Sequence, residues 1–225
     1  MKIKELKIYT QNISNQTDFY ENKIGLKIIE KSQSEVSFQI GKSVLRLIEN
    51  DKFQPYHFAI NIPSNKVKEA LDWLKSSVTI LKDGENEIQN FDFDLWNAKA
   101  IYFYDHDKNI VEFIGRKNLG NESNEDFSAN SLIEISEIGI PVNNIEATYN
   151  TLKETTNIEI FDGGFEKFCA IGDETGLFIC IDKSKKDWYP TGDKAYSSEF
   201  NIRLEEKERE FELEFVDGEI KSLNK

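Results

Sequence analysis

One order of elements, a strand followed by a helix and three further strands, occurs three times along the chain. Each copy begins with alternating apolar residues, continues with apolar residues at helical spacing, and ends with short strand-like segments separated by polar turns. The copies cover residues 2–50, 56–115 and 133–182. A repeat of this kind predicts an α+β fold made of tandem βαβββ units.

Polar residues mark the start of each predicted helix. Asn12, Ser64 and Asn144 precede the helical segments, and residues of these types commonly cap helices by accepting a hydrogen bond from the backbone. Gly25 follows the first helical segment, where glycine commonly ends a helix. The three caps give a common reference point for aligning the units.

Two regions lie outside the repeat. Residues 118–131 are rich in Gly, Asn and Ser and show no periodicity, so we expect a linker between domains there. Residues 199–223 alternate strongly and predict a β-hairpin or meander, either a shortened fourth unit or an added sheet edge. The expected organisation is therefore two paired units in residues 1–117, a linker at 118–131, and a third unit with a C-terminal strand extension in residues 132–225.

Composition limits the classes of partner. The 225 residues carry a net charge of −13 at pH 7, which disfavours binding to nucleic acid and to anionic membranes. No run of about 20 apolar residues is present, so no transmembrane helix is predicted. The first residues alternate like a strand and lack the apolar segment of a signal peptide. We therefore expect a cytoplasmic protein, monomeric or homodimeric, whose partner is a small molecule.

Two titratable side chains lie in strand segments that are otherwise apolar. His57 shares its strand face with Ala59, while its large apolar neighbours point to the opposite face. Glu112 shares a face with Ile110 and Ile114, and a carboxylate between apolar neighbours is unfavourable unless it is paired or bound to a metal. If the apolar face of the first of these strands packs on the helix, His57 points into a cavity. Both residues are therefore candidate site residues.

The repeated unit and two local motifs resemble the vicinal oxygen chelate superfamily, which includes glyoxalase I, bleomycin-resistance proteins, fosfomycin-resistance enzymes and extradiol dioxygenases. The segment NISNQTDFYENKIGLKI is similar to the first helix of the superfamily, and YFYDHDKNIVEFI is similar to its closing hairpin. In that hairpin, His106 and Lys108 replace the usual proline and glycine. The resemblance implies curved half-barrel sheets that close around a cavity between paired units, with the helices outside.

In metal-dependent members of the superfamily, the ligands come from the first and last strands of paired units. Aligned on their helix caps, the units have these residues at the first-strand position: Glu5, His57 and Glu137. The matching last-strand positions are Arg46, Glu112 and Ile179. With units one and two paired, the resemblance implies a cavity lined by Glu5, Arg46, His57 and Glu112. Because Ile179 cannot bind a metal, we expect no metal in the C-terminal half.

Arg46 departs from the pattern of the superfamily, because a guanidinium cannot bind a metal and stays protonated. Either Glu5, His57 and Glu112 still hold a metal and Arg46 points at an anionic substrate, or the site is metal-free and its polar residues bind a ligand or fill the cavity. One imidazole and two carboxylates would suit Fe(II), Mn(II), Zn(II) or Ni(II). The resemblance implies that such a metal polarises two adjacent oxygens of the substrate.

Two functions follow from these alternatives. The first is a metal-dependent lyase, isomerase or ring-cleaving dioxygenase acting on a small oxygenated molecule, with Glu5 and Arg46 in catalytic roles. The second is a metal-free protein that binds a drug or metabolite, as bleomycin-resistance proteins do. Residues 187–196 either cover the mouth of the cavity or only connect strands. The aromatic candidates for the cavity wall are Tyr9, Phe38, Phe91, Phe93, Trp96 and Tyr102.

Overall fold

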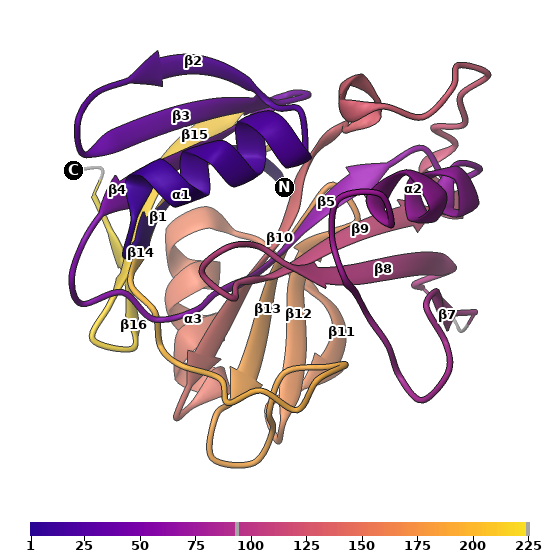
Figure 1. The fold of residues 1–225 in the computed structure, drawn as a ribbon. Helices are drawn as coiled ribbons and strands as arrows, with labels where there is room; N and C mark the ends of the chain where they lie inside the picture. Colours follow the sequence, from indigo (N-terminus) through magenta and orange to yellow (C-terminus); the bar gives the residue numbers. More distant parts are fainter. Residues whose placement is uncertain (93–94, 224–225) are drawn as a thin grey trace.

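The structure is a computed structural model that describes residues 1–92 and 95–223. It consists mainly of strands in a seven-stranded and a nine-stranded sheet, and the predicted α+β class and tandem βαβββ units are confirmed. Figure 1 shows the seven-stranded sheet at the upper left, crossed by α1, and the nine-stranded sheet to the right and below. Within the described residues, no helix is long and apolar enough to cross a membrane.

The seven-stranded sheet combines the first unit with the C-terminal strands, in the order β16-β15-β14-β1-β4-β3-β2. The first unit consists of β1 (Lys2–Thr10), α1 (Ile13–Asp18), the helical turn η1 (Phe19–Lys23), β2 (Lys27–Lys31), β3 (Glu35–Ile40) and β4 (Ser43–Glu49). The C-terminal strands are β14 (Phe200–Glu206), β15 (Arg209–Val216) and β16 (Glu219–Ser222). Because β14 pairs with the edge of β1, in the antiparallel direction, the C-terminal meander extends this sheet.

The nine-stranded sheet combines the second and third units, in the order β11-β12-β13-β10-β5-β9-β8-β6, with β7 also paired to β8. The second unit consists of β5 (His57–Ile62), α2 (Val67–Leu74), β6 (Ile80–Leu81), β7 (Gln89–Phe91), β8 (Ala98–Tyr104) and β9 (Ile110–Arg116). The third consists of β10 (Glu134–Val142), α3 (Ile145–Thr156), β11 (Ile160–Gly164), β12 (Phe168–Asp173) and β13 (Gly176–Asp182). The short helical turns η2 (Lys117–Leu119) and η3 (Ala129–Ser131) lie between the two units.

The pairing of the units differs from the predicted pairing of units one and two. Unit two pairs with unit three through the antiparallel strands β5 and β10, and unit one pairs with the C-terminal meander through β1 and β14. Strand β10 is buried along its whole length, which suits a central strand covered on both faces. β5 is bonded on one edge by β9 and on the other by β10, so the chain between β9 and β10 connects the two sides of β5.

One apolar core joins the two sheets and the three α-helices. Phe58, Ile60 and Ile62 of β5 point into this core, together with the apolar face of α2. His57 and Ala59 lie on the opposite face of β5, where a second apolar cluster and the cavity are found. The alternation along β5 therefore confirms the predicted orientation of His57, away from the helix.

The predicted caps hold for two of the helices. Asn12 and Asn144 cap α1 and α3, and each side chain accepts a hydrogen bond from the backbone N–H three residues later. The predicted cap of the second helix is wrong, because α2 begins after Lys66 and Ser64 makes no capping bond to it. The alignment of the strands is unaffected by this shift of the helix start.

Candidate metal centre

His57 begins β5 and faces the cavity. Its Nδ1 atom lies 3.2 Å from the carbonyl oxygen of Ile110 on the neighbouring strand β9, so the ring can donate its Nδ1 proton to this carbonyl. Burial lowers the pKa of His57 to about 4, so the ring is neutral at pH 7. The Nε2 atom then carries a free lone pair, and it lies 3.6 Å from Oε2 of Glu112.

Strand register places two glutamates beside His57. Glu112 on β9 and Glu137 on β10 are both paired with Ala59, the β5 residue between them. Because side chains two residues apart share a strand face, His57 and Ala59 point to the same side of the sheet. The small methyl group of Ala59 leaves room for the two carboxylates to approach each other. The two glutamates and His57 are all buried.

The two glutamates influence each other's protonation. Burial raises the pKa of Glu112 well above its usual value, and the negative charge of Glu137 raises it further. Burial also raises the pKa of Glu137, although the ion pair that Glu137 forms with the fully buried Arg116 acts against this rise. When both carboxylates are ionised, Glu112, Glu137 and Arg116 together carry one excess negative charge. Tyr102 on β8 is paired with Glu112 in the strand register, and its side chain acts against the rise in the pKa of Glu112.

His57, Glu112 and Glu137 form a candidate ligand set for a divalent metal. One nitrogen or oxygen atom from each of them lies within 4.8 Å of the others. One imidazole and two carboxylates suit Fe(II), Mn(II), Zn(II) and Ni(II), and a hydrogen bond from the second ring nitrogen to a backbone carbonyl is a usual support of a metal-binding histidine. A divalent cation would more than offset the excess charge of the two ionised glutamates and Arg116, leaving one net positive charge. Ile179, at the equivalent last-strand position of unit three, supplies no ligand atom.

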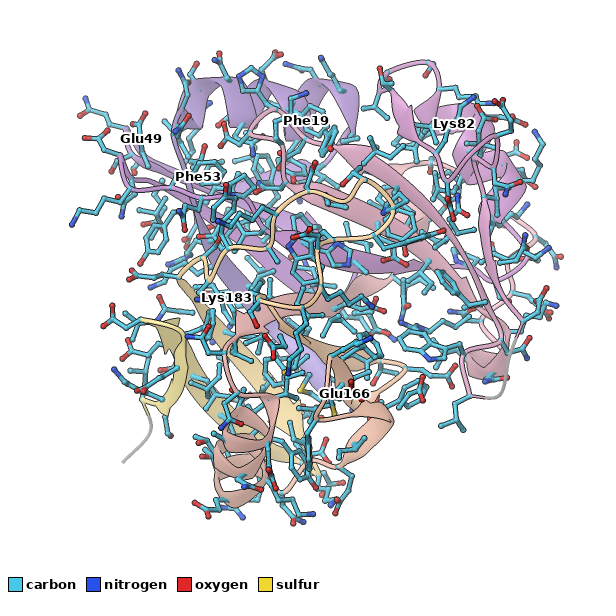
Figure 2. The ribbon with its side chains drawn as sticks, turned by 90° about the horizontal axis from the view of Figure 1, so that it is seen from below. Phe19, Glu49, Phe53, Lys82, Glu166 and Lys183 are labelled. Carbon is cyan, nitrogen blue, oxygen red and sulfur yellow. The ribbon has the colours of Figure 1, made fainter. Side chains whose placement is uncertain are left out.

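The three residues line a cavity of about 450 Å³ whose other walls are mainly aromatic. The loop between β13 and β14 contributes Lys186, Trp188 and Tyr189 to this cavity, and Figure 2 shows the loop leaving Lys183 and crossing the molecule. Trp188 packs against Gly139, where a Cβ atom would lie 2.5 Å from the indole ring. The close approach to this glycine brings the ring centroid of Trp188 to 5.0 Å from that of His57.

The structure separates Glu5 and Arg46 from His57 and Glu112, so the predicted grouping is corrected. Glu5 lies on β1 and Arg46 on β4, both in the seven-stranded sheet. Arg46 forms ion pairs with three carboxylates of that sheet, and Glu5 is also paired with an arginine of β14. Units one and two do not share a sheet, so Glu5 and Arg46 lie apart from His57 and Glu112. They belong to an ion-pair network of the seven-stranded sheet. Glu5 therefore leaves the candidate ligand set, and Arg46 leaves the candidate site.

Glu137 occupies the place that the sequence analysis gave to Glu5. A signal was present, because Glu137 precedes Asn144 by seven residues, as His57 precedes Ser64. The missing information was the pairing of unit two with unit three. The expectation of no metal in the C-terminal half rested on the same assumed pairing of units one and two. The structure instead brings Glu137 of β10 beside His57 and Glu112, so this half supplies a candidate ligand. Arg116 gave no sequence signal.

The aromatic candidates divide between the cavity and other regions. Phe91, Trp96 and Tyr102 line the cavity. Phe38 is buried in the apolar core, and Tyr9 lies on β1 in the other sheet. Phe93 lies outside the described residues.

Known proteins show similarity to this chain in sequence and in fold. No protein-family model matches the chain. The chain is 28% identical over 108 residues to the metallothiol transferase FosB of Staphylococcus haemolyticus, and the match covers 45% of this chain and 73% of FosB.

One solved structure resembles the chain over most of its length. A candidate dioxygenase from Bacillus subtilis superposes with a TM-score of 0.58 at 13% identity, over 80% of this chain and 63% of that protein. This chain thus spans less than two thirds of the length of that structure. A lactoylglutathione lyase from Agrobacterium tumefaciens has a TM-score of 0.41 at 18% identity, over 49% of this chain and 90% of the lyase.

Proposed function

We propose that this chain is a glyoxalase-like or dioxygenase-like enzyme acting on a small oxygenated molecule. Its βαβββ units, its similarity in sequence to FosB and its similarity in fold to a candidate dioxygenase support the resemblance to the vicinal oxygen chelate superfamily. His57, Glu112 and Glu137 hold one divalent metal, which is Fe, Mn, Zn or Ni. The observation that carries the proposal is the convergence of three ligand atoms within 4.8 Å at the wall of an aromatic cavity. The names of two of the proteins described above, a metallothiol transferase and a candidate dioxygenase, support the same class of chemistry.

The protein's own groups would prepare the site for this chemistry. When bound, the metal supplies a Lewis acid for two adjacent oxygens of the substrate. Ile110 fixes the tautomer of His57, and Arg116 fixes one carboxylate oxygen of Glu137. Tyr102, paired with Glu112 on the neighbouring strand, favours the ionised form of the Glu112 carboxyl group. The aromatic walls reduce the access of water, which strengthens the electrostatic interactions inside the cavity.

Metal binding is expected to displace a proton from Glu112. Burial and the nearby charge of Glu137 raise its pKa, so in the metal-free protein this carboxyl group keeps its proton to a higher pH than an exposed glutamate. The raised pKa stabilises the metal-free protein fully below the ordinary value of 4.5, and this contribution is lost as the pH rises through the raised pKa. The affinity for a divalent metal should accordingly increase as the pH rises through the same range.

Titration calorimetry with Mn²⁺ in two buffers of different ionisation enthalpy measures this effect. Because burial and the charge of Glu137 raise the pKa of Glu112, we expect metal binding to release protons, and the number released per metal bound to fall as the pH rises. Binding that releases no proton at any pH would show that Glu112 is not displaced by the metal.

A metal-free binding protein of the bleomycin-resistance type is the second candidate function. The observation that favours it is the buried ion pair between Arg116 and Glu137, which neutralises part of the site without a cation. In this alternative, Glu112 stays protonated and the cavity binds a drug or metabolite without reaction. The same calorimetry distinguishes the two functions, because no heat of binding for Mn²⁺, Fe²⁺, Zn²⁺ or Ni²⁺ would favour the binding protein.

A further inference from the structure

A series of ring contacts surrounds the cavity, and we call it the aromatic belt. Its seven rings belong, in order, to Phe168, Trp96, Phe91, Tyr189, Tyr102, His57 and Trp188. Successive ring centroids lie between 5.0 and 6.4 Å apart, the spacing of favourable aromatic contacts. The rings come from β5, β7, β8, β12 and two loops, so distant parts of the second and third units build one wall.

The cavity is larger than a very small substrate requires. Its volume of about 450 Å³ corresponds to about 15 water molecules at the density of the liquid. A ligand of three or four carbon atoms held by His57, Glu112 and Glu137 would leave most of the aromatic belt in contact with water. Because burying apolar surface is favourable, a flat ligand with two rings would bind this wall more strongly by removing more of its apolar surface from water.

One cation faces this cavity without a carboxylate partner. The exposed side chain of Lys186 lines the cavity, and its Nζ atom lies 4.6 Å from the ring centroid of Phe168, at one end of the belt. In the parts of the chain that the structure describes, no carboxylate oxygen lies within 4.0 Å of this ammonium group. The adjacent Lys185, by contrast, is paired with Asp182 at 2.8 Å. Lys186 is therefore available to an anionic group of a ligand.

We propose that this cavity takes a flat aromatic molecule that carries one anionic group. The rings of the ligand stack within the belt, and the anionic group contacts Lys186 at the mouth. Asp162 also lines the cavity, but its carboxylate accepts a hydrogen bond from Nε1 of Trp96 at 2.6 Å. This carboxylate therefore has a partner within the cavity wall. The inference deepens the proposed function and rests on it only for the oxygenated end of the ligand, which would reach the metal ligands.

Two fluorescent dyes test the inference without knowledge of the natural ligand. Anilinonaphthalene sulfonate carries a flat ring system and one anionic group, and N-phenyl-1-naphthylamine has the same rings without the charge. Both dyes are titrated into the metal-free protein in the presence of a chelator. The variants are Lys186→Met, the neighbouring control Lys185→Met, and Ile179→Trp, which fills the cavity from the strand side.

We expect both dyes to bind, and Ile179→Trp to weaken both by more than about tenfold because it removes the space for the rings. Lys186→Met should weaken the sulfonate by about three- to fivefold, the effect of an exposed ion pair, and leave the neutral dye unchanged. Lys185→Met should change neither affinity. Circular dichroism and thermal unfolding verify that Ile179→Trp is folded, and a second cavity-filling variant, Ile181→Phe, at another residue that lines the cavity, replaces it if it is not.

Two results would overturn the inference. Equal losses of sulfonate binding in Lys186→Met and Lys185→Met would show that Lys186 does not recognise the anionic group. Unchanged binding of both dyes in the folded cavity-filling variant would show that the rings bind elsewhere. Because the chelator removes any metal, these outcomes do not depend on the metal site, and Mn²⁺ titration of Lys186→Met tests that site separately.

Discussion

Replacement of Arg116 by methionine is expected to lower the free energy of unfolding of the metal-free protein by about 3–5 kcal/mol at pH 7. Arg116 is fully buried and paired with Glu137, so the substitution leaves two buried carboxylates, Glu112 and Glu137, without an opposite charge. Urea unfolding in the presence of a chelator measures the loss. The matched control is Arg203→Met, which removes an exposed arginine paired with Glu5 and should cost less than about 1 kcal/mol.

The same substitution should strengthen metal binding, and this result separates the two candidate functions. Without Arg116, both carboxylates are free to neutralise a divalent cation, and the cation no longer meets a neighbouring positive charge. Saturating Mn²⁺ or Zn²⁺ should therefore restore most of the lost stability to Arg116→Met, because a ligand that binds only the folded state stabilises it. If the metals leave the stability of the variant unchanged, the two glutamates do not act as metal ligands.

Replacement of Asp105 by asparagine is expected to destabilise the protein by about 3 kcal/mol or more. Asp105 is a buried residue in the turn between β8 and β9. Its Oδ2 atom accepts hydrogen bonds from the side chains of Gln16, Tyr20 and Asn109, and its Oδ1 atom accepts two from backbone N–H groups. An amide in either orientation would place its NH₂ group against donors.

Urea unfolding at pH 7 measures this loss, with Asp51→Asn as the control. Asp51 is exposed in the turn after β4, so its replacement should change the free energy of unfolding by less than about 0.5 kcal/mol. Gln16 and Tyr20 belong to unit one, so a large effect in Asp105→Asn alone would show that this turn joins the first unit to the second. Equal stability of the two variants would contradict this role.

The sequence predicted the elements and their order because each signal is local. Alternation, helical spacing and turn residues identified the βαβββ units, and the alternation along β5 placed His57 on the face away from the core. Glu112 was identified because a carboxylate stood between two apolar residues of one strand face. These inferences required knowledge of single strands only, and the structure agrees with them.

The remaining parts of the site depend on contacts between distant segments. Glu137 lay at the expected offset from its cap, but its selection over Glu5 required knowing that β10 and not β1 borders β5. The burial of Arg116 and the position of Trp188 over Gly139 depend on packing across strands and a loop that are far apart in sequence. The pattern of residues along one strand does not predict such packing between distant segments.

The metal content of matched variants tests the central claim most directly. Wild-type protein and the variants Glu137→Gln and Glu5→Gln are dialysed in turn against Mn²⁺, Fe²⁺, Zn²⁺ and Ni²⁺, and the bound metal is measured by elemental analysis. Our account predicts close to one metal per chain in the wild type and in Glu5→Gln, and almost none in Glu137→Gln. Equal metal content in wild type and Glu137→Gln, or loss of metal in Glu5→Gln, would contradict the assignment of the site to His57, Glu112 and Glu137.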